Sequence, residues 1–351
     1  MHRYFDPLPS PDEVKKKVPL PERCEEFVFS ARKQARKMLF GDPRLVFIVG
    51  PCSIHDPLSA IEYARCFKEL SEKVEKTCFL VMRFYPEKSR TTIGWKGLLY
   101  DPYLDGSHDI ETGLLWTREL LVHLAALQIP VATEFVDPMT APYFDDLITW
   151  GFIGARTSSS QPHRQLASSL SFPIGFKNAT DGNLEVAIQG ILSARTRHAF
   201  LGLDSHGKVA KIQSEGNPLT HLVLRGGLDG PNYDASSVDK ALQQLEEYQV
   251  SSRILIDCAH DNCQKQYEKQ KDVFTAVLEQ ILDGNESIFG MMLESHLESG
   301  QQLFQSNGSP THSSVSITDP CIGWSLTEEL LLSADSMLSS SSSTIISFTH
   351  N

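Results

Sequence analysis

The sequence predicts an α/β protein of the (β/α)8 barrel class, the TIM barrel. Eight short apolar runs, rich in β-branched and aromatic residues, are spread along the 351 residues. The apolar residues within each run are continuous rather than alternating, which is typical of strands buried on both faces of a parallel sheet. Segments with apolar residues at three- and four-residue spacing separate several runs and predict helices. Strands and helices in this order favour a closed parallel barrel over a sandwich.

The predicted strands are residues 45–49, 79–84, 130–135, 152–156, 173–177, 221–224, 253–256 and 288–293. Amphipathic helices are predicted between several of them, at 60–74, 114–127 and 269–282. A ninth apolar run, 200–203, leads into a polar stretch instead of a helix. This run predicts part of a β-hairpin inserted before the sixth barrel strand.

The two ends of the chain are expected to lie outside the barrel. Residues 1–43 should form an N-terminal arm and helix: prolines at positions 7, 9 and 11 discourage regular structure at the start, and apolar residues four apart predict a helix over 22–39. The barrel should occupy 44–335, with a polar, turn-rich loop at 299–314. Residues 336–351 contain a run of five serines and are expected to be disordered.

The composition is that of a soluble globular protein, with 41% hydrophobic and 22% charged residues. A net charge of −12 argues against nucleic acid or an anionic membrane as partner. We find no apolar stretch long enough to span a bilayer and no secretion signal. The seven cysteines are scattered and do not resemble a disulfide framework, so a cytoplasmic location is expected.

Reactive or ionic side chains stand at almost every predicted strand end. In a (β/α)8 barrel these ends meet at one rim, where the following loops build the active site. Taken singly, most such residues would be structural: a lone cysteine is commonly a small buried hydrophobe. Their number on one rim is what predicts a site. In chain order they are Cys52, Arg83, Lys88, Arg90, Glu134, Arg156, Lys177, Arg225, Asp257, His260, Glu294 and His296.

The charge types at this rim suggest what it binds. Six of these residues are lysines or arginines, although the protein as a whole is acidic. Guanidinium groups suit bidentate capture of phosphate or carboxylate, and ammonium groups supply compact positive charge. Because so many cations would repel one another in one mouth, we expect anionic substrates of similar total charge. Two phosphorylated substrates, one also a carboxylate, would balance them.

A metal site is also expected at the rim. Cys52, His260, Glu294 and a further acid form a mixed sulfur, nitrogen and oxygen donor set. Such a set suits one divalent ion, Mn, Fe, Co or Zn, and does not select among them. An ion in a barrel mouth can polarise a carbonyl oxygen as a Lewis acid.

Several segments resemble motifs of the type I (class I-alpha) 3-deoxy-D-arabino-heptulosonate 7-phosphate (DAHP) synthases. The longest are GPCSIHD at 50–56, EKSRTTIGWKG at 87–97 and SITDPCIGW at 316–324. Shorter matches are GART at 154–157, GFKN at 175–178, LRGG at 224–227 and ESHL at 294–297. Their order and spacing match the family over 44–324, so the resemblance is specific.

The resemblance implies that phosphoenolpyruvate and erythrose 4-phosphate condense to DAHP and phosphate, the first step of the shikimate pathway. By motif position it assigns the metal ligands as Cys52, His260, Glu294 and Asp319. It assigns phosphoenolpyruvate to Arg83, Lys88, Arg156, Lys177 and Arg225, and the phosphate of erythrose 4-phosphate to Arg90 and Thr91. Lys88 would also assist proton transfer. A homo-oligomer, dimer or tetramer, is implied too.

The sequence departs from the family at four places. Ser89 stands where the family usually has proline, which predicts a less rigid loop, and Ser158-Ser159-Ser160-Gln161 lacks the family's glutamate. The arm before residue 11 lacks the family's acidic pair, and 137–142 is rearranged. These last two differences predict weakened or absent feedback by phenylalanine, tyrosine or tryptophan.

Three alternatives remain open from the sequence. A KDO8P or sialic acid synthase would use the same barrel and phosphoenolpyruvate with another aldose, although the 88–91 segment resembles the DAHP type. A catalytically dead barrel could act as a binding or regulatory subunit, which the complete ligand set disfavours. A phosphosugar lyase could use Lys177 for a Schiff base.

Overall fold

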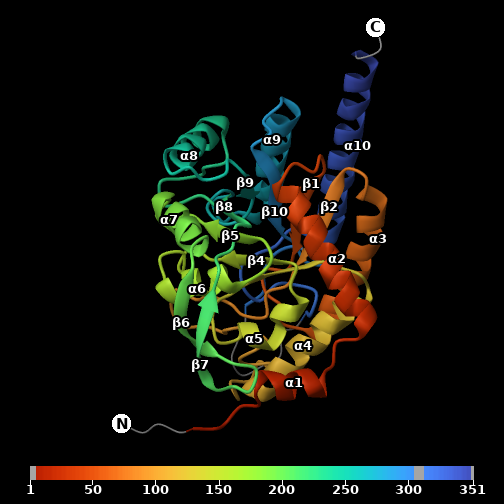
Figure 1. Cartoon of the computed structure of the whole chain (residues 1–351). Helices are drawn as coiled ribbons and strands as arrows, with labels where there is room; N and C mark the ends of the chain where they lie inside the picture. The colour runs from red at the N-terminus through yellow and green to blue at the C-terminus, as the bar shows by residue number, and fades with distance from the viewer. Residues whose placement is uncertain (1–4, 304–311, 349–351) are drawn as a thin grey trace.

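The computed structural model describes residues 5–303 and 312–348, with side chains to residue 341. Within it, eight parallel strands close into a barrel in the order β1-β10-β9-β8-β5-β4-β3-β2. The strands are β1 (Leu45–Gly50), β2 (Cys78–Arg83), β3 (Val131–Glu134), β4 (Trp150–Ile153), β5 (Ile174–Lys177), β8 (Thr220–Leu224), β9 (Ile254–Asp257) and β10 (Ile288–Glu294). The predicted fold class is thereby confirmed (Figure 1).

Strand β4 differs from the prediction. It begins at Trp150 and ends at Ile153, so Arg156 lies in the following turn and not on the strand. Trp150 is fully buried in the barrel and pairs with Ala132, which fixes the register. The turn begins at Gly154, whose carbonyl accepts hydrogen bonds from the backbone N–H groups of Thr157 and Ser158. From this turn, the Arg156 side chain reaches the cavities at the carboxyl ends of the strands.

Helices surround the barrel and follow most of its strands (Figure 1). They are α2 (Glu22–Leu39), α3 (Pro57–Val74), α4 (Ile110–Ala126), α5 (Ala141–Phe144), α6 (Gln161–Ser169), α7 (Glu185–Ala194), α8 (Ala235–Glu247), α9 (Gln270–Leu282) and α10 (Trp324–Phe348). Helices α3, α4 and α9 extend or trim the predicted segments by a few residues, and α2 has the predicted bounds. No helix in the described part of the chain is long and apolar enough to cross a membrane.

Alternate residues of the strands point to two separate cores. On β1, Val46 and Ile48 belong to a cluster inside the barrel, whereas Phe47 and Val49 face the surrounding helices. Side chains of α2, among them Met38, join the interior cluster. Helix α2 therefore covers one end of the barrel, and the rim at the carboxyl ends of the strands is left for chemistry.

The proline-rich start of the chain contains a helix that the prediction missed. Helix α1 (Pro11–Lys17) begins at Pro11, with Ser10 and Glu13 forming a reciprocal capping box. Proline is favourable at the first helical position because its missing N–H would have no partner there. Reading Pro11 as an obstacle to structure was wrong.

The predicted hairpin is present before the sixth barrel strand. Strands β6 (His198–Leu203) and β7 (Val209–Ser214) pair antiparallel between α7 and β8. The hairpin is held to α6 by a hydrogen bond of 2.6 Å between the hydroxyls of Ser168 and Ser214. Its turn reaches α1, where the Asp12 N–H donates to the Ser205 carbonyl.

The C-terminal segment also departs from the prediction. Helix α10 continues to Phe348, so the serine run expected to be disordered is helical; residues 349–351 lie outside the described part. No glycine or proline interrupts this segment, and serine lowers helix stability only modestly. The hydroxyls of Ser340 and Ser341 donate to carbonyls one turn back. In Figure 1, α10 projects away from the barrel.

The loop after β10 is partly described, because residues 304–311 lie outside the described chain. Isolated bridges join Ser295 to Ile322, Gly300 to Cys321 and Gln301 to Ser316. They hold the segment that carries Asp319 against the end of β10.

We expect Gly113→Ala to destabilise the fold by about 1–3 kcal/mol, because a Cβ at this position of α4 would lie 2.0 Å from the Leu99 carbonyl oxygen. Urea unfolding measures the free energy of unfolding. Glu119→Ala, at an exposed position of the same helix, is the control and should change stability by less than about 0.5 kcal/mol. Equal effects of the two substitutions would contradict the close packing inferred at Gly113.

Candidate active site

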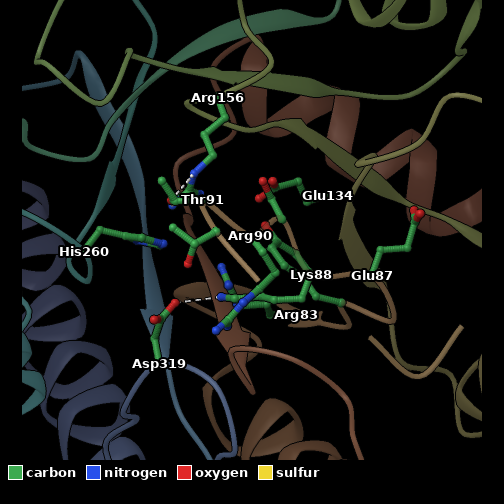
Figure 2. A pocket seen from close by; sticks show the side chains of 12 residues that line it. Arg83, Glu87, Lys88, Arg90, Thr91, Glu134, Arg156, His260 and Asp319 are labelled. Carbon is green, nitrogen blue, oxygen red and sulfur yellow. Dashed lines mark hydrogen bonds and ion pairs between the residues drawn. The ribbon is translucent and has the colours of Figure 1, made fainter. Parts of the chain in front are cut away.

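Two cavities open at the carboxyl-end rim of the barrel and share Thr91, Arg156, His260 and Asp319. The first has a volume of about 260 Å³ and contains most of the residues that the sequence singled out (Figure 2). Its lining is Arg83, Tyr85, Glu87, Lys88, Ser89, Arg90, Thr91, Thr92, Glu134, Arg156, His260 and Asp319. The second, of about 570 Å³, adds Arg225 and Glu294.

The predicted metal ligands converge at one corner of the mouth, beside His260 and Asp319, which line both cavities. One donor atom each from Cys52, Glu294 and Asp319 lies within 4.8 Å of the others. His260 joins them, with Nε2 3.7 Å from Oε1 of Glu294. This donor set fits a divalent cation. The ammonium of Lys88 lies 2.7 Å from both Cys52 Sγ and Asp319 Oδ2, so the cluster already attracts positive charge.

The protonation states at this corner follow from burial and charge. Burial, with Glu294 nearby, raises the pKa of the Cys52 thiol to about 12. The thiol lies 3.4 Å from Asp319 Oδ2 and donates to it. The Lys88 ammonium holds the pKa of Asp319 well below its usual range. Burial opposes the charge of Lys88, but Cys52 and Asp319 outweigh it and raise the pKa of Lys88.

Glu294 is fixed by a buried ion pair and by an amide side chain. Arg83 Nη2 donates to Glu294 Oε1 at 2.7 Å, and both side chains are almost fully buried. Burial opposes ionisation of Glu294, but the charges of Arg83, His260 and Lys88 together outweigh burial and lower the pKa of the carboxyl. The side chain of Gln270 accepts from the Glu294 N–H at 2.9 Å and donates to its carbonyl at 3.1 Å. The ring of Tyr85 lies 3.8 Å from the Arg83 guanidinium.

Beside this corner, Lys177 and His260 meet at one carboxylate. Asp257 Oδ2 lies 2.8 Å from Lys177 Nζ and 3.0 Å from His260 Nδ1. Asp257 is fully buried. Burial opposes its charge, but His260 and Lys177 outweigh burial and lower the pKa of this carboxyl well below its usual range.

The other predicted cations have different partners. Arg225 is paired with Asp261, and its backbone N–H donates to Asn178 Oδ1 at 2.9 Å. Arg156 donates to the Thr91 hydroxyl from Nε at 2.9 Å and from Nη2 at 2.7 Å (Figure 2). Arg90 lies in the exposed part of the same loop, beside Lys88 and Arg83 (Figure 2).

These pairings correct one expectation from the sequence. Carboxylates of the protein neutralise four of the six cations: Glu294 pairs with Arg83, Asp319 with Lys88, Asp257 with Lys177 and Asp261 with Arg225. The cations can therefore coexist without bound anions. Arg156 and Arg90 face the cavity, where Arg156 donates to the Thr91 hydroxyl.

A buried acid anchors the loop that carries Lys88, Arg90 and Thr91. Glu87 is 1% exposed, and its carboxyl accepts from the Thr140 hydroxyl at 3.0 Å and from the Tyr100 hydroxyl at 3.3 Å. Burial raises the pKa of Glu87 to about 8. The other end of the loop returns through a hydrogen bond from the Lys88 N–H to the Lys96 carbonyl.

The sequence analysis gave no role to Asp257, Asp261, Glu87 or Gln270. Asp257 stands at the end of β9 and was visible in the survey of strand ends. Asp261 directly follows His260, but its partner Arg225 is distant in sequence. Gln270 lies on the first turn of α9, and no strand-end pattern could have found it.

Fold and site define a barrel with a donor set that could hold a metal ion beside a cluster of cations. Residues 28–332 match the DAHP synthetase I family. The chain belongs to the DAHP synthetase I family, and its function is that of a DAHP synthase at the first step of aromatic biosynthesis.

Individual relatives agree. The chain is 45% identical over 325 residues to the Tyr-sensitive phospho-2-dehydro-3-deoxyheptonate aldolase of Escherichia coli, covering 92% of this chain and 91% of that protein. It is 44% identical over 337 residues to the Trp-sensitive enzyme of Buchnera aphidicola, covering 95% and 96%. The solved structure of the aldolase from Francisella tularensis matches with a TM-score of 0.93 and 41% identity, covering 97% and 99%. The sensitivities named are those of the relatives; weakened feedback in this chain stays a prediction.

Glu87→Gln should reduce the pH dependence of stability. A carboxyl with its folded-state pKa raised to about 8 keeps a proton that the unfolded chain releases near pH 4.5, so parent stability falls as pH rises from about 4.5 to about 8. One such group contributes at most about 1.4 kcal/mol per pH unit. Urea unfolding at several pH values in this window should therefore give a shallower slope for the variant. Identical slopes would mean that Glu87 is ionised in the folded protein.

Proposed function

We propose that this site condenses phosphoenolpyruvate with erythrose 4-phosphate and water to give DAHP and phosphate. The observation that carries the proposal is the convergence of Cys52, His260, Glu294 and Asp319 beside a cavity lined by Arg83, Lys88 and Arg156. In the reaction, C3 of phosphoenolpyruvate bonds to the aldehyde carbon. Water then adds at C2, and the resulting hemiketal phosphate releases phosphate.

Phosphoenolpyruvate is held by Arg83, Lys88, Arg156, Lys177 and Arg225 in this proposal. Lys177 and Arg225 approach from β5 and the end of β8, and Arg83 and Lys88 from β2 and its loop. Since these groups are fixed by ion pairs with the protein, they can stabilise the phosphate and carboxylate with little reorganisation. Arg156 is exposed and has a neutral partner, so an anion can take it over at low cost.

Erythrose 4-phosphate is held through its phosphate by Arg90 and Thr91, with Ser89 beside them. The Thr91 hydroxyl accepts from Arg156, so the two substrate sites are in direct contact. Anchoring of this loop at Glu87 would keep the aldehyde carbon close to C3 of phosphoenolpyruvate, which lowers the entropic part of the barrier.

Cys52, His260, Glu294 and Asp319 would hold one divalent ion, Mn, Fe, Co or Zn. When bound, such an ion supplies Lewis-acid polarisation of the aldehyde oxygen. Lys88 is close enough to this corner to carry a proton to the oxygen, because its ammonium already contacts Cys52 and Asp319. We assign Lys88, Cys52 and His260 as the catalytic residues.

The rival functions differ from this proposal in what they need. A KDO8P-type synthase would accept arabinose 5-phosphate, and a phosphosugar lyase would form a Schiff base at Lys177, whose ammonium is engaged by Asp257. A dead barrel would have no use for the complete donor set. We expect the protein to be a cytoplasmic homo-oligomer, dimer or tetramer, which light scattering can check.

Purified protein should release phosphate from phosphoenolpyruvate only when erythrose 4-phosphate is present, and chelator should abolish the release until a divalent ion is restored. Arabinose 5-phosphate is the matched acceptor control and should be a poor substrate. Borohydride with substrate should trap no adduct at Lys177. Preference for arabinose 5-phosphate, or turnover insensitive to chelator, would overturn the proposal.

Cys52→Ala should lose stoichiometric metal and lower kcat by more than the roughly 100-fold that loss of a supporting partner costs a metal site. Elemental analysis of the purified variant and initial rates measure the two effects. Cys66→Ala, at a half-buried thiol of α3, is the control and should retain both metal and activity. Full metal content in Cys52→Ala would remove this residue from the ligand set.

A further inference from the structure

The carboxylate of Asp257 is the point where two parts of the site meet. It stands at the last position of β9 and is 0% exposed. Its Oδ2 lies 2.8 Å from Lys177 Nζ and 3.0 Å from His260 Nδ1. Lys177 belongs to the proposed phosphoenolpyruvate site and His260 to the proposed metal site. One oxygen atom therefore contacts a residue of each.

The carboxylate itself is held rigidly. Its Oδ1 accepts from the Ala259 N–H at 3.1 Å. The Asp257 carbonyl accepts from the Asn262 side chain at 2.8 Å, and the following N–H, of Cys258, donates to the Met292 carbonyl of β10. Both the backbone and the side chain of Asp257 are thus fixed, which a group that orients others requires.

His260 depends on Asp257 for its orientation. Its backbone has φ of 57°, a conformation that residues other than glycine rarely adopt, so the ring is placed by a strained turn. With Nδ1 beside Asp257, Nε2 points toward Glu294, at 3.7 Å (Figure 2 shows the ring facing the cavity). A carboxylate on the far nitrogen of a metal-binding histidine fixes the tautomer and makes the metal-facing nitrogen more basic.

Lys177 depends on the same carboxylate. Its side chain is 3% exposed, and its ammonium donates to Asp257 Oδ2 at 2.8 Å. An ammonium on a flexible stem is placed by its acceptors, whereas a guanidinium has a planar fork of its own. Removal of the Asp257 carboxylate would leave the buried ammonium of Lys177 without the acceptor that fixes its position.

We propose that Asp257 is a positioning residue that orients the metal ligand His260 and the substrate-binding Lys177 through one shared carboxylate oxygen. The inference rests on the proposed function for the identity of the two ligands. Asp257 would contact neither the metal ion nor phosphoenolpyruvate, but the binding of both would depend on it.

A purely structural role gives a different expectation. If Asp257 only neutralised the buried charge of Lys177, a variant lacking both charges would behave like the parent at the metal site. If Asp257 orients His260, metal affinity stays low in that variant, because the histidine still lacks the charged carboxylate beside Nδ1 and the asparagine NH2 group can face the ring instead. Asp257→Asn and the double variant Asp257→Asn/Lys177→Met separate the two roles, and the double variant leaves no unpaired buried charge that would hinder folding.

The test measures two affinities on full-length protein stripped of metal. Mn²⁺ alone is titrated, with the free ion followed by electron paramagnetic resonance. Phosphoenolpyruvate is titrated separately, in the presence of chelator, by calorimetry. Asp146→Asn is the matched control. It removes the carboxylate that Arg118 of α4 binds at 2.8 Å. Asp146 precedes the first residue of β4, so it lies at the end of the strands opposite to the rim. Circular dichroism reports whether each variant is folded.

We expect Asp257→Asn to weaken Mn²⁺ binding by about 10- to 100-fold, as for other partners of metal-bound histidines. Phosphoenolpyruvate binding without metal should weaken by about tenfold, the size expected for loss of one hydrogen bond to a charged group. The double variant should keep the weak Mn²⁺ binding, and Asp146→Asn should change neither affinity.

Parent-like Mn²⁺ affinity in either Asp257 variant, or parent-like phosphoenolpyruvate affinity in Asp257→Asn, would overturn the proposal. Failure of the parent protein to bind phosphoenolpyruvate or to release phosphate would be a different result. It would remove the proposed function, while the Mn²⁺ titrations would still decide whether Asp257 orients His260.

Discussion

Closure of eight parallel strands into a barrel is the constraint on which the rest of this structure depends. Parallel pairing sends every strand in the same direction, so all eight carboxyl ends meet at one rim. The strands must also approach closely, and glycines make this possible: a Cβ on Gly50 would lie 2.5 Å from the Arg83 carbonyl oxygen, and one on Gly290 2.3 Å from that of Val46. Side chains that lie far apart in sequence, such as Arg83 of β2 and Glu294 of β10, are thereby brought within hydrogen-bonding distance.

The rim is stable without ligands because its charges are paired before substrates arrive. The pair of Arg83 and Glu294 is almost completely buried and sits beside Cys52. Breaking such a pair by removing one partner costs several kcal/mol, because the other charge stays buried and uncompensated. The paired side chains are oriented in advance, and such preorganisation is the condition for electrostatic catalysis.

The exposed groups of the mouth differ from these buried ion pairs. Arg156 and Thr91 hydrogen-bond to each other at an exposed position, and they come from the loop after β2 and the turn after β4. A hydroxyl holds a guanidinium less strongly than a carboxylate does, so an anion could replace this contact. The mouth thus combines rigid pairs at its floor with exchangeable contacts at its edge.

The sequence by itself determined the barrel, the hairpin and the residues of the rim, because continuous apolar runs and the polar residues that end them are local patterns. Local patterns failed where a neighbour decided the outcome. Pro11 begins α1 because Ser10 and Glu13 cap that helix, and Arg156 follows a strand whose register is set by Trp150 in the barrel. Only the tertiary structure paired Asp257 with Lys177 and His260. The pairing with Lys177 depends on the strand order after closure, which places β5 and β9 on either side of β8, and no spacing along the chain records it.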